Sequence, residues 1–316
     1  MDKISEDALA NFVQGQEKIN EEPATKKKSQ LEEIQEVRSE RTAQAKTYAL
    51  ENGLGWLEVA VDNLPTQGLF YPEGTKLLIR AATGAEIRHW STIDDTDLAS
   101  IDDALSYVLE RCLKVKFPDG AGQASWKDLK EIDRFYIILS IRDFTFTSGT
   151  NDLKIVISES KTITVHKDDI EFMDIDKKLM DHYNPERRCF SFAVKDKPNL
   201  NVYMPSCGVS QWLKGYVQRK QQLQQGFDED YIKLAPMLIA DYRGLSDFAY
   251  EDYLNTSMQN FGAYEYSLLA RVRSLIENSI DPKIKYTDED GVERVAPLNF
   301  RGGLQSLFLL DMDDIL

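Results

Sequence analysis

The sequence predicts an α+β fold: a small sheet with packed amphipathic helices, then a β-rich middle section and a helical C-terminal region. Three observations carry this prediction. Short alternating segments flank a turn between Pro65 and Gly68, two segments with helical periodicity follow, and a period of two residues begins at Leu153. An extended or helical N-terminal arm precedes all of these elements. The changes of period divide the chain into residues 1–50, 51–150, 151–226 and 227–316.

The first section, residues 1–50, is polar and nearly charge-balanced, with few large apolar side chains. Such a segment cannot bury enough surface to offset the entropy lost when it is ordered. We therefore expect a polar arm that neighbouring subunits stabilise. Its candidate partner-binding residues are Leu31, Ile34 and Val37.

The second section, residues 51–150, predicts two short strands and two helices. Leu57, Val59 and Val61 alternate with other residues before the turn, and residues 76–80 form a second strand pattern. An apolar stripe with helical spacing then predicts the first helix; it consists of Ile101, Leu105, Val108, Leu109 and Cys112. Ser125 is placed to cap the second helix, whose apolar side holds Leu129, Ile132, Phe135, Tyr136 and Leu139. Packing of both helices on the small sheet would give a compact α+β unit.

The two remaining sections differ in period. The section 151–226 begins with Leu153, Ile155 and Ile157, which alternate with polar residues, and it contains turn signals such as Asn184-Pro185, so we expect a β-rich section up to about residue 206. Helical spacing returns after Pro205, and in the section 227–316 we expect helices near residues 231–238 and 268–276 and a weaker third over 247–258. An apolar tail around residues 307–310 follows.

Composition limits the classes of function. The formal net charge is −15 and the pI is near 4.8, so the surface repels polyphosphate and we expect no direct binding of nucleic acid. The three cysteines, Cys112, Cys189 and Cys207, are too few and too far apart for a disulfide framework, which fits synthesis in a reducing cytoplasm. No apolar run approaches the roughly 20 residues that span a bilayer, so we expect no membrane partner and no export.

Catalytic and metal-binding signatures are weak. The candidate ligands His89, His166, His182, Cys189 and Cys207 do not have the spacing of a structural zinc site. No Gly-x-Ser-x-Gly or phosphate-binding loop occurs. The adjacent carboxylates Asp102-Asp103, Asp168-Asp169 and Asp313-Asp314 could suggest glycosidase chemistry, but neighbouring side chains point in different directions, and capping or solvation explains them better. We expect no enzyme, no cofactor and no metal.

The order of elements from Trp56 to Phe146 resembles a known family. Asn63-Leu64-Pro65-Thr66-Gln67-Gly68-Leu69-Phe70-Tyr71-Pro72-Glu73-Gly74 leads into Leu77-Leu78-Ile79-Arg80 and Ala82-Thr83-Gly84-Ala85-Glu86. This series resembles the baseplate hub proteins of T-even-type contractile bacteriophage tails. The resemblance covers roughly a third of the chain. It implies a structural protein of the virion, located in the tail baseplate and synthesised in the host cytoplasm, with other tail or baseplate proteins as partners in a symmetric assembly.

Apolar groups outside the periodic segments are candidates for those contacts. Leu69, Phe70 and Tyr71 either complete the chain's own core or dock on another subunit, and for Phe308, Leu309 and Leu310 we favour docking. Two other functions stay open. The chain could be an assembly chaperone for the hub or tape-measure complex, or a virion-associated peptidoglycan hydrolase.

Overall fold

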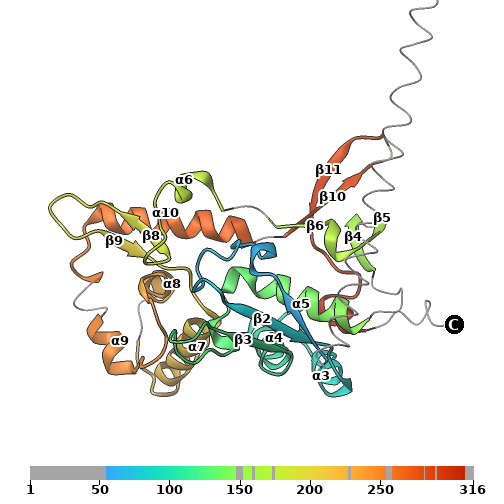
Figure 1. Cartoon of the computed structure of the whole chain (residues 1–316), viewed down its shortest axis with the longest axis horizontal. Coiled ribbons are helices and arrows are strands. Elements are labelled where there is room, and N and C mark those ends of the chain that lie inside the picture. Colours follow the sequence, from blue (N-terminus) through green and yellow to red (C-terminus); the bar gives the residue numbers. More distant parts are fainter. Residues whose placement is uncertain are drawn as a thin grey trace, which may run out of the picture. The chain divides into compact units, whose positions relative to one another are not determined.

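The structure, a computed structural model, describes residues 55–146, 152–158, 161–172, 175–226, 229–253, 258–280, 282–288 and 290–309. The chain divides into two compact units, Met1–Leu57 and Glu58–Leu316. The predicted arm, with Leu31, Ile34 and Val37, lies outside the described residues. Within the described residues the fold is α+β, with helices and small sheets, as the sequence predicts (Figure 1).

The first sheet has the order β1 (Trp56–Val59), β2 (Lys76–Arg80) and β3 (Leu113–Lys116). Strands β2 and β3 are antiparallel, with Leu77 opposite Val115 and Ile79 opposite Leu113. All four of these side chains are buried, while their neighbours along each strand are more exposed. The period of two therefore gives this sheet one apolar face. The strand predicted over residues 76–80 is confirmed.

Helix α3 (Gly84–Trp90) is an element that the sequence analysis did not predict. It begins with a capping box, in which Thr83 and Glu86 bond each other's backbone N–H groups. Burial alone would raise the pKa of Glu86, but hydrogen bonds from Arg80 and Thr83 hold it at about 2. The Thr83-x-x-Glu86 spacing is a sequence signal that could have located this helix.

Helices α4 (Leu98–Cys112) and α5 (Glu131–Thr145) are the two predicted helices, with shifted starts. The cap of α4 is Asp97, whose side chain accepts a hydrogen bond from the Ala99 N–H. Ser125 is a cap as predicted, but of the short 3₁₀ turn Trp126–Asp128, and α5 begins only at Glu131. A capping box fixes one turn locally, so it does not determine whether an α-helix continues from that turn.

The turn between Pro65 and Gly68 is attached to α5 by hydrogen bonds to a buried carboxylate of that helix. Asp133 accepts hydrogen bonds from the Thr66 N–H (2.9 Å), the Thr66 hydroxyl (2.7 Å) and the Tyr71 hydroxyl (2.7 Å). Burial raises the pKa of Asp133 to about 6, although these hydrogen bonds favour the charged form. This network fixes the turn against α5 over a sequence separation of more than 60 residues.

The residues of the turn belong to the core. Phe70 and Tyr71 are buried, and the Phe70 ring meets Phe190 edge to face with centroids 5.4 Å apart. Leu69 is partly buried and packs against the same core, and its carbonyl accepts a hydrogen bond from the Tyr183 hydroxyl. The alternative in which Phe70 and Tyr71 dock on another subunit is therefore wrong, because both side chains are buried within the chain and leave no surface for a partner.

The middle section is rich in β-structure, as predicted. Its strands form a β4–β5 hairpin and a β7-β8-β9 sheet, and β6 joins a third sheet with two later strands. The bounds are β4 (Leu153–Ser158), β5 (Lys161–Val165), β6 (Ile170–Glu171), β7 (Tyr183–Asn184), β8 (Cys189–Phe192) and β9 (Leu200–Val202), with the short helix α6 (Lys177–Met180) among them.

The last part of the chain is helical with one exception. After α7 (Cys207–Gln222), helices α8 (Glu229–Leu234), α9 (Asp247–Tyr253) and α10 (Ala263–Ile280) lie where helical spacing was predicted. The exception is the hairpin of β10 (Lys283–Thr287) and β11 (Glu293–Pro297), which the sequence analysis missed. Alternating burial along β10 and the Asp290-Gly291 pair are its signals.

The position of Phe308 shows that the prediction made for it in the apolar tail is wrong. The tail forms a 3₁₀ turn, Leu304–Phe308, and the Phe308 ring is 1% exposed and lies 4.9 Å from the Trp90 ring of α3. The Trp90 indole N–H donates to the Leu304 carbonyl at 2.7 Å. Phe308 therefore closes this chain's own core and does not dock on a partner. Leu309 is 44% exposed, and Leu310 lies outside the described residues.

One apolar cluster joins segments that lie far apart in the sequence. It includes Phe70 of the turn, Ile132 of α5, Phe190 of β8, Tyr216 of α7 and Leu269 of α10. These side chains are nearly fully buried, so α7 is packed on one side against the body of Glu58–Leu316. The candidate site lies along a neighbouring side of α7 and shares Trp212 with this cluster.

Candidate functional site

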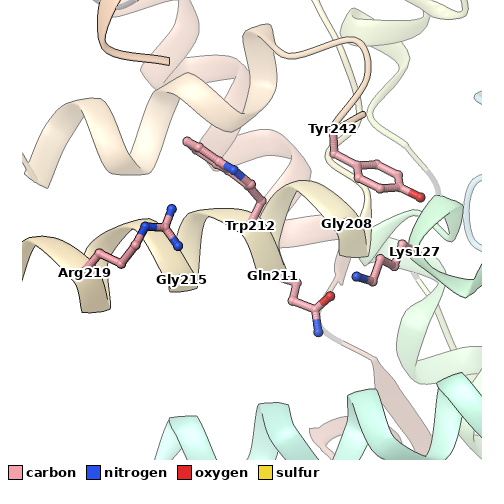
Figure 2. Close-up of a pocket in the computed structure, with 7 residues that line it drawn as sticks. All are labelled: Lys127, Gly208, Gln211, Trp212, Gly215, Arg219 and Tyr242. Carbon is pink, nitrogen blue, oxygen red and sulfur yellow. The ribbon is translucent and has the colours of Figure 1, made fainter. Parts of the chain in front are cut away.

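A groove lies along one side of α7. Its lining residues on this helix are Gly208, Gln211, Trp212, Gly215 and Arg219, and they are completed by Lys127 and Tyr242 (Figure 2). The positions on α7 follow helical spacing, so they form one stripe. From Gly208 to Arg219 the stripe is about 16 Å long at 1.5 Å per residue. The cavity has a volume of about 250 Å³.

Glycine makes the floor of this groove. Figure 2 shows Trp212 and Gln211 leaving α7 on opposite sides, with Gly208 and Gly215 before and after them along the helix. At Gly208 a Cβ atom would lie 2.5 Å from the Tyr242 ring, so only glycine lets this ring pack directly against the helix backbone. At Gly215 a Cβ atom would meet only the end of the Arg219 side chain, at 3.1 Å. The end of the Arg219 side chain therefore lies over the helix backbone at Gly215.

The start of α7 is fixed by its cap and by the residues that precede α5. Ser206 is the N-cap, and its hydroxyl accepts a hydrogen bond from the Val209 N–H. The Cys207 N–H donates to the Leu129 carbonyl at 2.8 Å, and Lys130 and Ser206 form an isolated β-bridge. Cys207 and Gly208 thus lie in the first turn of a helix.

The walls of the groove are also held in place. The Tyr242 hydroxyl lies 3.1 Å from the Ser125 hydroxyl, and Arg243 beside it bonds the Asp128 carboxylate at 2.6 Å. At the other end, Arg219 makes two hydrogen bonds with Asp247 of α9, at 2.5 and 3.0 Å. Because both ends are tied to neighbouring elements, the groove is formed before any partner arrives.

Hydrogen-bond donors in the groove lack partners within the described part of the chain. The Trp212 indole N–H, the Gln211 amide and the Lys127 ammonium form no hydrogen bond or ion pair there. The Trp212 ring itself is packed, stacked on Tyr216 at 5.6 Å. The lining holds two cationic side chains and no carboxylate, although the whole chain has a net charge of −15. This combination suits a partner that supplies acceptors or negative charge.

Exposed apolar side chains are found on the same helices. Leu223 caps the C-terminal end of α7 and is 65% exposed. Phe248 is the second residue of α9 and is 83% exposed. The bond between Arg219 and Asp247 holds these two helix ends near each other. Large exposed apolar groups beside a preformed groove are typical of protein contact surfaces.

A second depression of about 320 Å³ lies where α3 ends and α4 begins. Its polar lining includes His89, Asp97, Ser100 and Asp103. Lys214 of α7 already pairs with Asp103 at 2.7 Å, and Asp97 caps α4. These carboxylates therefore serve the fold, and the α7 groove is the better candidate site.

The candidate metal ligands are dispersed in the structure. His89 stacks on Tyr107, His182 lies against Phe192, and Cys189 and Cys207 are buried. No group of three or more His, Cys, Asp or Glu side chains among the described residues could hold a metal ion.

The adjacent carboxylate pairs have separate roles. Asp102 and Asp103 both pair with Lys214. Asp168 and Asp169 lie in a 3₁₀ turn that follows His166. The pair Asp313-Asp314 lies outside the described residues.

His166 gives the structure a pH dependence that can be measured. Contacts with Asp143 (3.4 Å) and Asp168 (3.3 Å) raise the pKa of His166 to about 9, and Lys167 also approaches Asp143 at 3.7 Å. A pKa above the unfolded value of about 6.5 stabilises the fold fully below that pH, and this contribution is lost as the pH rises through about 9. After screening by solvent we expect a loss of about 1 kcal/mol.

The measurement is the free energy of urea unfolding at pH 6 and at pH 9.5, in the parent and in His166→Gln. In the variant, the free energy of unfolding should differ much less between the two pH values than it does in the parent. An equal difference in both proteins would show that other groups produce it.

The predicted partner-binding residues do not form this groove. The buried Phe70, Tyr71 and Phe308 serve the core, and Leu309 is the one predicted residue with a clearly exposed side chain among those described. Sequence reasoning missed α7 and its lining. The available signals were Ser206 as a cap and the two glycines seven residues apart, with Trp212 between them.

No family model, curated protein or solved structure matches this chain. No helix in the described ranges is long and apolar enough to cross a membrane.

Proposed function

We propose that this chain is a structural component of the hub region of a contractile phage tail baseplate and acts through protein–protein contacts. Two kinds of support exist. The segment from Trp56 to Phe146 has the residues and order of elements that resemble the baseplate hub family. Its turn and helix α5 pack in one apolar cluster with the later helices.

The observation that carries the proposal is the α7 groove. Its floor is glycine backbone, its rim holds donors without partners among the described residues, and exposed Leu223 and Phe248 lie on helices beside it. A partner segment would satisfy the donors and cover the apolar groups, which stabilises an interface at roughly 25 cal/mol per Å² of apolar surface before ordering costs are deducted.

Quantitative mass spectrometry of purified phage particles tests this function. A baseplate component is present in a fixed ratio to the other tail proteins after the particles are purified. An assembly chaperone would be abundant in the infected cell and absent from the particles. That second result would overturn the proposal in favour of the chaperone.

Deletion of residues 1–45 separates the predicted arm from the rest of the protein. We expect the shortened chain to keep its circular dichroism spectrum and thermal midpoint, because the described core lies within Glu58–Leu316. We also expect it to be missing from the particles, because the arm is predicted to bind neighbouring subunits. Loss of the folded core, or normal incorporation without the arm, would contradict this division of roles.

A further inference from the structure

We propose that the α7 groove binds the C-terminal segment Leu310–Leu316 of a second copy of this chain. This inference rests on the proposed function, since it names the partner of the same site. The segment reads Leu-Asp-Met-Asp-Asp-Ile-Leu and lies outside the described residues. Four of its seven residues are large and apolar, and three are aspartates.

Charge complementarity favours this occupant. The groove has Lys127 and Arg219 at its rim and no carboxylate in its lining. Arg219 is already paired with Asp247, but the Lys127 ammonium has no ion pair within the described ranges. Three aspartates within four positions, Asp311, Asp313 and Asp314, would bring carboxylates to Lys127 and acceptors to the donors of Gln211 and Trp212.

The length and apolar content of the segment also fit. Seven extended residues span at most about 23 to 25 Å, and the glycine-floored stripe of α7 is about 16 Å long. At Gly215 the end of the flexible Arg219 side chain lies over the helix backbone, and an aliphatic side chain that enters beside Trp212 would displace it. The described chain ends at Leu309, which is 44% exposed, so the segment continues from a partly exposed residue.

This contact would be heterologous, because a tail on one copy meets a groove on another. Such contacts close into rings or continue as open chains, according to the rotation between copies. A variant with a blocked groove still offers its tail, and a variant without the tail still offers its groove. Two such variants, each unable to self-associate, should therefore associate with each other.

The test uses variants that keep α7 intact. Gly215→Leu fills the groove, and it removes a glycine from a helix interior, which raises helix propensity. Gln221→Leu is the matched control, because Gln221 lies on the exposed far side of the same helix and does not line the groove. The tail variants are a chain that ends at Leu309 and a full chain with Asp311, Asp313 and Asp314 changed to Asn.

The first measurement is the binding of a fluorescein-labelled peptide of residues 309–316 to the chain that ends at Leu309, by fluorescence anisotropy. We expect saturable binding that Gly215→Leu and Lys127→Glu each weaken by at least about tenfold. Gln221→Leu should bind like the parent. The peptide with three asparagines should bind more weakly, and the difference should shrink at high salt. Equal binding by Gly215→Leu and Gln221→Leu would overturn the site.

The second measurement is the mass of the full chains by light scattering at increasing concentration. The parent and Gln221→Leu should associate, while full-length Gly215→Leu and either tail variant should each stay monomeric. An equimolar mixture of full-length Gly215→Leu with a tail variant should form a one-to-one complex. A mixture that stays monomeric overturns the proposal. A parent that is monomeric at every concentration, even though the peptide binds, also overturns it, because the tail would then occupy the groove of its own chain.

These results are independent of the particle analysis. A chain present in purified particles but unable to form the mixed complex would remove this inference and leave the proposed function. A mixed complex formed by a chain that is absent from particles would do the reverse.

Discussion

Asp133→Ala is expected to destabilise the protein by about 3 to 5 kcal/mol in urea unfolding. Asp133 is fully buried and accepts three hydrogen bonds from Thr66 and Tyr71. Alanine would leave these donors without an acceptor in a place that water does not reach, and the turn over residues 63–71 would lose its attachment to α5. The apolar contact between Phe70 and Phe190 depends on the same attachment.

The matched control for this variant is Asp119→Ala. Asp119 is an exposed residue of the loop after β3, and its loss should change the free energy of unfolding by less than about 0.5 kcal/mol. If Asp133→Ala were as mild as this control, the buried carboxylate would not hold the turn.

Phe308→Ala is expected to lower the free energy of unfolding by about 3 to 5 kcal/mol, because it removes a buried aromatic ring from the core. The Phe308 ring is buried against Trp90, and Phe146 lies 6.5 Å away on another side. Removal of the ring would leave a cavity that Trp90 cannot fill, because its indole N–H is bonded to the Leu304 carbonyl. The measurement is the free energy of urea unfolding.

Leu309→Ala is the control, since Leu309 is the next residue and is 44% exposed. It should cost less than about 1 kcal/mol. Equal effects at the two positions would mean that Phe308 does not close the core, and the apolar tail would again be a candidate for docking.

The periodic parts of the fold could be predicted from the sequence. Alternation around Leu77 and Ile79 gave strand β2, and the apolar stripe ending at Cys112 gave helix α4, because in both cases one face is buried by the chain itself. The middle section showed its strands for the same reason. Periodicity reports burial, so it locates elements that bury one side.

The parts that were missed depend on other physical causes. Helix α3 is fixed by the Thr83 and Glu86 capping box, and the hairpin of β10 and β11 has only Ile284 and Ala296 on its buried face. Phe308 is buried by a contact with Trp90, which is more than 200 residues away in the sequence. Separation of that kind leaves no local pattern.

The candidate site was missed because a groove has no period of its own. Gly208 and Gly215 look alike in the sequence, yet the Tyr242 ring packs on one and the end of the Arg219 side chain lies over the other. Lys127 reaches the groove from a different element, and only the folded chain brings it beside Gln211 (Figure 2). Residues that line a surface together are chosen by tertiary structure.

Photo-crosslinking inside assembled particles shows whether the α7 groove contacts another protein. A photoreactive phenylalanine analogue is placed at Gln211, in the groove, or at Gln221, on the exposed far side of α7. If the groove is a protein contact, the probe at position 211 forms a defined protein crosslink after irradiation of purified particles, and the probe at position 221 gives only background. Background at both positions, in particles that contain the chain, would show that the groove is not a protein contact.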